Sequence, residues 1–196
     1  MNPVMTIGEQ VEDPKTAKGL VKREVIRVVT PGTITNSQAL EESKNNYLMG
    51  IVYTDGIFGI SVADVSTGDY LVTEVKSERN LIDEIYKFSP SEIICNEAFY
   101  MSGIDLDDLK NRLHAVISDL DNRFFSDEFC RKLLRDHFHV ENLEGLGLSD
   151  YETGTIAAGA VLQYLYETQK NSLEHLTRIT PLYNRPVYDA RHLHKA

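Results

Sequence analysis

A stretch of three β-prone runs, residues 46–77, constrains the fold of this chain more than any other part. It reads NYLMGIVYTDGIFGISVADVSTGDYLVTEVKS, with breaks at Asp55-Gly56 and at residues 66–69. Asp-Gly between two β-prone runs is the strongest short-range hairpin signal that a sequence offers. Gly68 supplies a residue that tolerates positive φ in the second break. The stretch therefore predicts a meander of three antiparallel strands.

Length and composition are those of a soluble globular protein. The chain has 196 residues, of which 42% are hydrophobic and 26% charged, enough to bury a sizeable core. No apolar run approaches the length of about 18 residues that a membrane span needs, and no secretory signal is visible, so we expect a cytoplasmic protein with no membrane partner. The formal net charge of -10 disfavours independent nucleic-acid binding, because neutralisation of phosphates dominates that affinity.

Two further strands are predicted before the meander, at Val4–Val11 and Leu20–Val29. Asp13-Pro14 breaks the first, and Pro31-Gly32 ends the second. These strands are too few to close a core alone, so we interpret them as the end of a domain or as an arm that packs on the next unit. The polar residues 35–46 are typical of a linker or a short surface helix.

Helices alternate with strands after the meander. A helix begins at an N-cap, Ser77, and stops before Pro90. The further expected elements are strands at Glu92–Asn96 and Ala115–Leu120, and helices at Asp105–Leu113 and Phe125–Phe138, the last with Phe129, Leu133 and Leu134 inward. Crossovers of this length imply parallel pairing. The expected fold is α/β: a mixed five-stranded sheet of three antiparallel strands followed by two parallel ones, flanked by helices in ribonuclease-H-like order.

The strongest helical pattern comes late in the chain. Ser149 to Glu152 has the form of a capping box, and an apolar stripe then runs to about Lys170. Gly154 and Gly159 each weaken a helix by about 1 kcal/mol relative to Ala, and glycines tolerated there often indicate close packing against a neighbour. Beyond Asn171 the helical signal fades.

One catalytic hypothesis follows from the carboxylates. A nuclease of the ribonuclease H type holds two divalent ions about 4 Å apart with several carboxylates. Asp55 and Asp64 are the candidate ligands, and the candidate partners are Glu97, Asp119 and Asp121. The alternative is that Asp55-Gly56 is only the hairpin turn, since β-prone residues resume at once. The first following helix also ends without a carboxylate, at Lys87-Phe88-Ser89, which favours the turn.

Other candidate residues have weaker patterns. The basic cluster Lys15, Lys18, Lys22 and Arg23 is interrupted by acidic residues, which favours a solvated loop over a phosphate site. His137 and His139 are spaced i, i+2 and do not share a helix face, and His192 and His194 lie in a tail without clear periodicity.

Cys95 and Cys130 lack metal-site spacing and fit reduced core residues. Gly145 and Gly147 are weak evidence for a phosphate site; they fit a role in the approach to the following helix.

Several strings together resemble the MutS family of bacterial DNA mismatch-repair proteins. They are GEQVEDPKTAKGLVKREVIRVVTPGT at 8–33, TGDY at 67–70, SPSEII at 89–94 and YETGTIAAGAVLQYLYETQKNSLEHL at 151–176. The resemblance implies three parts. Residues 1–34 would be the C-terminal segment of the mismatch-recognition domain, 35–171 the ribonuclease-H-like connector domain, and 172–196 the start of the core or lever domain, or a frayed tail. After Thr180 the sequence departs from the family pattern.

The resemblance implies a scaffold and no enzyme. In this family the connector joins mismatch recognition to the ATPase core and is implicated in docking MutL. The Phe-x-Glu wedge that meets the mismatch, and the ATPase domain that binds ATP and Mg, are not found in the sequence. We therefore expect no catalytic, cofactor-binding or metal-binding residues here, and contact with mismatched DNA only through other parts of the parent protein. The fragment is expected to be a monomer and the parent a homodimer.

Overall fold

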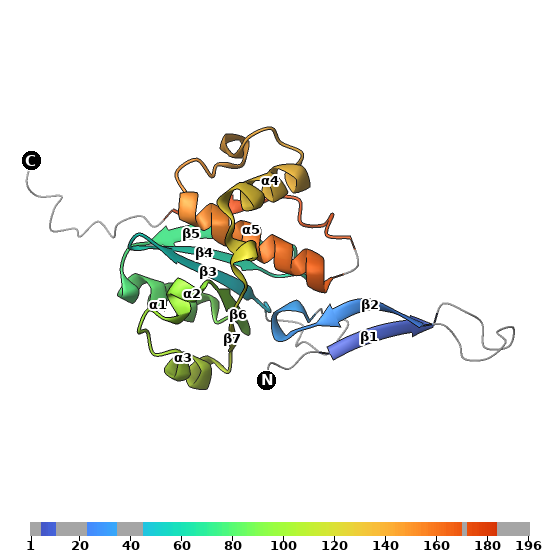
Figure 1. Cartoon of the computed structure of the whole chain (residues 1–196), viewed down its shortest axis with the longest axis horizontal. Helices are drawn as coiled ribbons and strands as arrows, with labels where there is room; N and C mark the ends of the chain where they lie inside the picture. Colours follow the sequence, from blue (N-terminus) through green and yellow to red (C-terminus); the bar gives the residue numbers. More distant parts are fainter. Residues whose placement is uncertain (1–4, 11–22, 35–44, 170–171, 184–196) are drawn as a thin grey trace, which may run out of the picture.

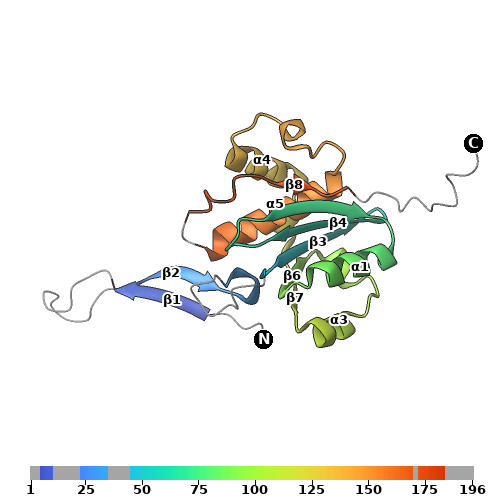
Figure 2. The same cartoon turned by 180° about the vertical axis from the view of Figure 1, so that it is seen from behind.

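A mixed α/β body carries a separate two-stranded arm that extends away from it (Figures 1 and 2). The computed structural model describes residues 5–10, 23–34, 45–169 and 172–183. None of the helices in these ranges combines the length and the apolar character needed to cross a bilayer.

The body is built on one mixed sheet of six strands, in the order β7-β6-β3-β4-β5-β8. The strands are β3 (Leu48–Thr54), β4 (Ile57–Ala63), β5 (Tyr70–Val75), β6 (Glu92–Cys95), β7 (Val116–Asp119) and β8 (Thr180–Pro181). β3, β4 and β5 form the antiparallel meander, while β6 pairs parallel to β3 and β7 pairs parallel to β6. This confirms the predicted mixed sheet. The two-residue strand β8, parallel to β5, extends it by one edge strand.

The Asp55-Gly56 hairpin has the predicted two-residue turn. Thr54 pairs with Ile57, and Asp55 and Gly56 have φ values of 51° and 78°. Positive φ at both central residues is the type I′ geometry, whose twist matches that of the flanking strands. The local sequence therefore sets this turn, as expected.

Helices cover both faces of the sheet (Figures 1 and 2). They are α1 (Glu78–Phe88), α2 (Glu97–Tyr100), α3 (Leu106–Leu113), α4 (Asp127–Phe138) and α5 (Glu152–Thr168). Successive strand residues point to opposite faces. Leu48 thus packs in one buried cluster with residues of α4 and α5, while Met49 packs in a second cluster with residues of α1, α2 and α3. The sheet is therefore buried between two helical layers.

Helix α5 packs unusually close to its neighbours, as its glycines indicated. A Cβ added at Gly154 would lie 2.8 Å from Cγ1 of Val72 in β5, and one at Gly159 would lie 2.7 Å from Cα of Cys130 in α4. This close approach also explains why one inward assignment was wrong. The face of α4 that meets α5 carries Cys130, so Phe129 turns outward and is 44% exposed.

The predicted capping box of α5 is wrong. The helix begins at Glu152 with Tyr151 as N-cap and no capping side chain from the N-cap residue. The Tyr151 N–H bonds to the Leu148 carbonyl at 3.0 Å, which places Ser149 in a turn before the helix. The backbone N–H of Gly154 instead donates to a carboxylate oxygen of Glu74 in β5, at 2.8 Å. A distant strand thus caps this helix.

The arm consists of β1 (Met5–Gln10) and β2 (Arg23–Val29), which pair antiparallel with a register irregularity between Ile7 and Gly8. Both strands were expected. A short 3₁₀ helix, η1 (Pro31–Thr33), follows β2 and leads the chain toward the body. The polar segment expected to be a linker or surface helix lies almost wholly outside the described residues.

Candidate functional site

The two aspartates of the nuclease hypothesis lie at opposite ends of β4. Asp55 sits in the turn before this strand and Asp64 directly after it. Seven residues of strand separate them, which at the usual rise per residue is about 20 Å. Two ions held about 4 Å apart cannot be shared by carboxylates at that separation. The structure therefore does not bring the hypothetical ligand pair together.

Asp64 instead organises the turn that follows β4. It is 1% exposed, and its carboxylate accepts the backbone N–H of Ser66 at 2.8 Å and that of Asn46 at 3.1 Å. A carboxylate bonded to backbone N–H groups in this way stabilises a turn. Together with the Asp55 hairpin, this gives both candidate aspartates a role in shaping turns.

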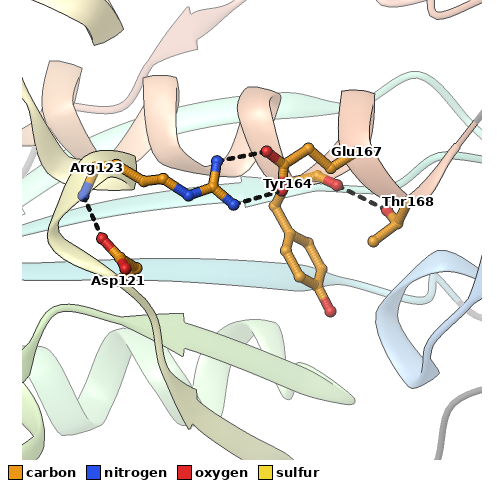
Figure 3. Close-up of polar contacts among 5 residues, drawn as sticks. All are labelled: Asp121, Arg123, Tyr164, Glu167 and Thr168. Carbon is orange, nitrogen blue, oxygen red and sulfur yellow. Dashed lines mark hydrogen bonds and ion pairs between the residues drawn. The ribbon is translucent and has the colours of Figure 1, made fainter.

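The three candidate partners gather at one edge of the sheet. Glu97, Asp119 and Asp121 are exposed and line a surface cavity of about 490 Å³ at the carboxyl ends of β6 and β7. Asp121 caps the 3₁₀ helix η3 (Asn122–Phe125), since its carboxylate accepts the Arg123 N–H at 3.0 Å (Figure 3). Among the residues that the structure describes, no three His, Cys, Asp or Glu side chains are placed to hold a metal ion.

His137 and His139, whose spacing argued against a shared helix face, have separate structural roles. His137 Nδ1 lies 2.6 Å from the hydroxyl of Tyr166, and its Nε2 lies 2.8 Å from the carbonyl oxygen of Leu176. Because a carbonyl only accepts, Nε2 carries the proton. His139 ends α4 in a left-handed conformation, with φ of 56°. The first histidine thus fastens the segment 172–183 to the helical layer, and the second terminates a helix.

The remaining candidates are structural or lie outside the described residues. Gly147 ends the 3₁₀ helix η4 (Leu143–Leu146) with φ of 74°. Cys95 and Cys130 are free and buried, and burial raises the pKa of each thiol to about 12. Arg23 opens β2, and the residues that the structure does not describe are Lys15, Lys18, Lys22, His192 and His194.

One buried polar cluster joins the arm to the body. Glu92, the first residue of β6, is 2% exposed. One carboxylate oxygen accepts the hydroxyl of Thr30 at 2.5 Å and the N–H of Gly32 at 3.0 Å, and the other accepts the hydroxyl of Tyr164 in α5 at 2.5 Å. Three donors from two distant segments therefore converge on one carboxylate. We call Glu92, Thr30, Gly32 and Tyr164 the Glu92 junction.

Neutral hydrogen bonds surround the Glu92 junction. The side-chain amide of Asn46 donates to the Pro31 carbonyl at 2.7 Å, and the Ser91 hydroxyl lies 2.9 Å from the same carbonyl. The side chain of Gln169, just after α5, reaches the Val28 carbonyl at 3.3 Å. A Cβ at Gly32 would lie 3.0 Å from Cβ of Glu92, so the close approach of the turn favours glycine at this position. The exit of β2 is therefore held against both β6 and α5.

The electrostatics of the Glu92 junction fit a buried anion. A buried carboxylate is tolerated when hydrogen bonds replace its water, and here three donors do so. Burial is the larger cause and the nearby Glu92 carboxylate the smaller cause of a pKa of Tyr164 well above its usual value. Tyr164 therefore remains a donor. Figure 3 shows the Tyr164 ring leaving α5, beside the two-pronged ion pair of Arg123 with Glu167, whose shorter contact is 2.6 Å.

Sequence reasoning missed the Glu92 junction. Residues 92–96 were expected to form a buried strand, and β6 does so. A glutamate at the start of a buried strand is itself a signal, because glutamate is rarely buried without partners. Its partners were not readable, since they lie 60 to 72 residues away along the chain.

Sequence models of two domains of one protein family match this chain: MutS domain II at residues 46–177 and MutS domain I at residues 4–38. The DNA mismatch repair protein MutS of Lachnoclostridium phytofermentans is 58% identical over 177 residues, which are 90% of this chain and 19% of that protein. The MutS proteins of Acetivibrio thermocellus and Methanococcoides burtonii are 44% and 37% identical, over 88% and 90% of this chain and 20% of each relative. The chain thus spans about a fifth of the length of these curated relatives. With a family model matching well over half of its residues, the chain belongs to the MutS family of DNA mismatch-repair proteins.

Proposed function

We propose that this chain is a non-catalytic connector module that links mismatch recognition to the ATPase core of a MutS-type protein and offers a docking surface for MutL. The observation that carries the proposal is the Glu92 junction. Thr30 and Gly32 lie in the segment matched by MutS domain I, whereas Glu92 and Tyr164 lie in the segment matched by MutS domain II. A linker between two domains needs such a defined contact.

The linking role follows from the geometry of that contact. The arm meets β6 through Glu92 and the end of α5 through Gln169. These elements belong to a sheet and a helix whose cores are buried, so a displacement of the arm acts on the whole body. The proposed parts are residues 1–34 from the recognition domain, 35–171 as the connector, and 172–196 leading toward the core. ATP, Mg and tight contact with mismatched DNA are then tasks of other parts of a dimeric, cytoplasmic parent.

An exposed hollow supports the docking role. A surface cavity of about 570 Å³ at the carboxyl end of β6 is lined by Asn96, Glu97, Ala98, Met101, Asn122 and Phe125. Met101 is 74% exposed. An apolar side chain within a polar rim is the composition of a protein–protein contact. We therefore place the docking surface for MutL around Met101.

Binding of MutL to this chain tests the docking role. In biolayer interferometry with the immobilised chain, we expect Met101→Ser to weaken MutL binding at least tenfold, because it removes the exposed apolar anchor. Tyr183→Ser is the matched control, since Tyr183 is 71% exposed and lies outside this hollow. Failure of the unsubstituted chain to bind MutL would overturn the docking role, and equal losses in both variants would overturn the placement at Met101.

A further inference from the structure

In the Glu92 junction, only neutral groups donate hydrogen bonds to the buried carboxylate of Glu92. The carboxylate is buried, and its three donors are neutral groups: two hydroxyls and one backbone N–H. Two of these donors, Thr30 and Gly32, belong to the exit of the arm. If the arm moved away, Glu92 would keep one donor, and a buried charge with one donor is strongly disfavoured unless water enters. The ionised carboxylate therefore favours one position of the arm.

The other bonds across this contact are neutral. Asn46 and Ser91 both reach the Pro31 carbonyl, and Gln169 reaches the Val28 carbonyl. Hydrogen bonds to an ionised group are roughly twice as strong as bonds between neutral groups, and they also lose more when they break. The charge on Glu92 therefore contributes more to holding the arm than any of these neutral bonds.

We propose that Glu92 is a charged latch that fixes the angle between the β1–β2 arm and the sheet, so that neutralising this carboxylate turns the exit of β2 into a hinge. In the linker function proposed above, Glu92 is the single side chain that controls the position of the arm. The latch rests on that function only for its role in the parent protein. Glu92 is a positioning residue: it acts through Thr30 and Gly32. Tyr164 completes the latch by holding the second carboxylate oxygen from α5.

The orientation of the arm can be measured directly. Nitroxide labels at Glu9→Cys in β1 and Asp83→Cys in α1 report the distance between arm and body by pulsed electron paramagnetic resonance. Native Cys95 and Cys130 are fully buried and their pKa is about 12, so they do not take the label. We expect one narrow distance distribution in the otherwise unsubstituted chain. Glu92→Leu should widen it at least twofold, and Glu92→Gln should widen it less, because the amide still accepts hydrogen bonds.

Matched variants separate the latch from a general loss of structure. Glu97→Gln neutralises an exposed glutamate on α2 and should leave the distribution narrow. Thr30→Val removes one donor from the arm without a buried volume change and should also widen the distribution, which keeps the test open where Glu92→Leu fails to fold. Far-ultraviolet circular dichroism checks that the sheet persists in each variant.

The outcome decides between a latch and a purely local hydrogen bond. Equally narrow distributions in folded Glu92→Leu and Thr30→Val would overturn the latch, as would a broad distribution in the otherwise unsubstituted chain. Neither MutL nor DNA takes part in this measurement. A failed latch therefore leaves the MutL binding result intact, and failed MutL binding leaves the latch intact.

Discussion

Asp55 lies in a turn between two strands and Glu92 is the first residue of a strand, yet only the role of Asp55 was readable from its neighbours. The Asp-Gly pair contains its own turn, and the positive φ values of both residues are a local consequence of that pair. Glu92 depends on donors that the fold brings from Thr30, 62 residues earlier, and from Tyr164, 72 residues later. Local chemistry can be predicted at the scale of a residue, whereas convergence of distant residues requires the fold.

Tyr164 provides a test at this scale. Tyr164→Phe leaves one oxygen of the buried Glu92 carboxylate without its donor, and an unsatisfied buried acceptor costs about 1–3 kcal/mol. We expect the free energy of unfolding, measured by urea titration, to fall by that amount. Tyr183→Phe is the control, because Tyr183 is 71% exposed. An unchanged unfolding midpoint for Tyr164→Phe would show that water replaces the hydroxyl at no cost.

Helix α5 illustrates what can be predicted for an element. Its existence and its close packing were both expected, because the apolar stripe and the two glycines lie within one continuous stretch. Its start was wrong by two residues, because the sequence offers a capping box at Ser149, whereas the helix has Tyr151 as N-cap and its first turn is bonded by Glu74 from β5. The side chain that caps Gly154 lies 80 residues away in the chain. Tertiary contact thus overrides a good local capping signal.

Two substitutions discriminate between these caps. Glu74→Ala removes a carboxylate from the N-terminus of a helix of 17 residues, where a capping group and a favourable charge together contribute about 1 kcal/mol. We expect thermal unfolding to shift to a lower temperature by several degrees. Ser149→Ala should leave the unfolding temperature unchanged. A lower unfolding temperature for Ser149→Ala, with no change for Glu74→Ala, would identify Ser149 as the cap instead.

At the scale of the whole molecule, the predicted order of strands and helices determined most of the sheet. The meander and the crossover helices predicted the mixed sheet and its ribonuclease-H-like order, because each element had a clear periodic pattern. β8 was not predicted, since a strand of two residues that contains Pro181 has no periodicity to detect. Glu97, Asp119 and Asp121 lie together at the carboxyl ends of β6 and β7, whereas Asp55 and Asp64 lie at opposite ends of β4. Strand order alone therefore did not locate a site.

The buried thiol and phenol groups predict that the whole molecule loses stability at alkaline pH. Burial raises the pKa of the Cys95 and Cys130 thiols to about 12 and raises the pKa of Tyr70 and Tyr164 well above the usual value. The native state keeps protons that the unfolded chain releases near pH 8.5 for cysteine and near pH 10 for tyrosine, so stability is present below these values and falls above them. Urea midpoints should decrease progressively from about pH 8.5 to pH 11.

The contribution of the thiols can be separated from that of the tyrosines. In a Cys95→Ala, Cys130→Ala double variant, the decline should begin closer to pH 10, where tyrosine ionises in the unfolded chain. A urea midpoint that stays constant to pH 11 in the unsubstituted chain would contradict the assignment of these buried protons.

The strand order also determines how the molecule carries mechanical load. The arm is attached at β6, whereas the segment 172–183 runs to β8 at the far side of β5. One path for a tension between Val29 and Tyr183 crosses the sheet from β6 through β3 and β4 to β5, and a second passes through the end of α5, which the arm contacts at Gln169. On the first path the backbone hydrogen bonds between those strands lie in series with the load, so the antiparallel meander at the centre of the sheet bears part of it.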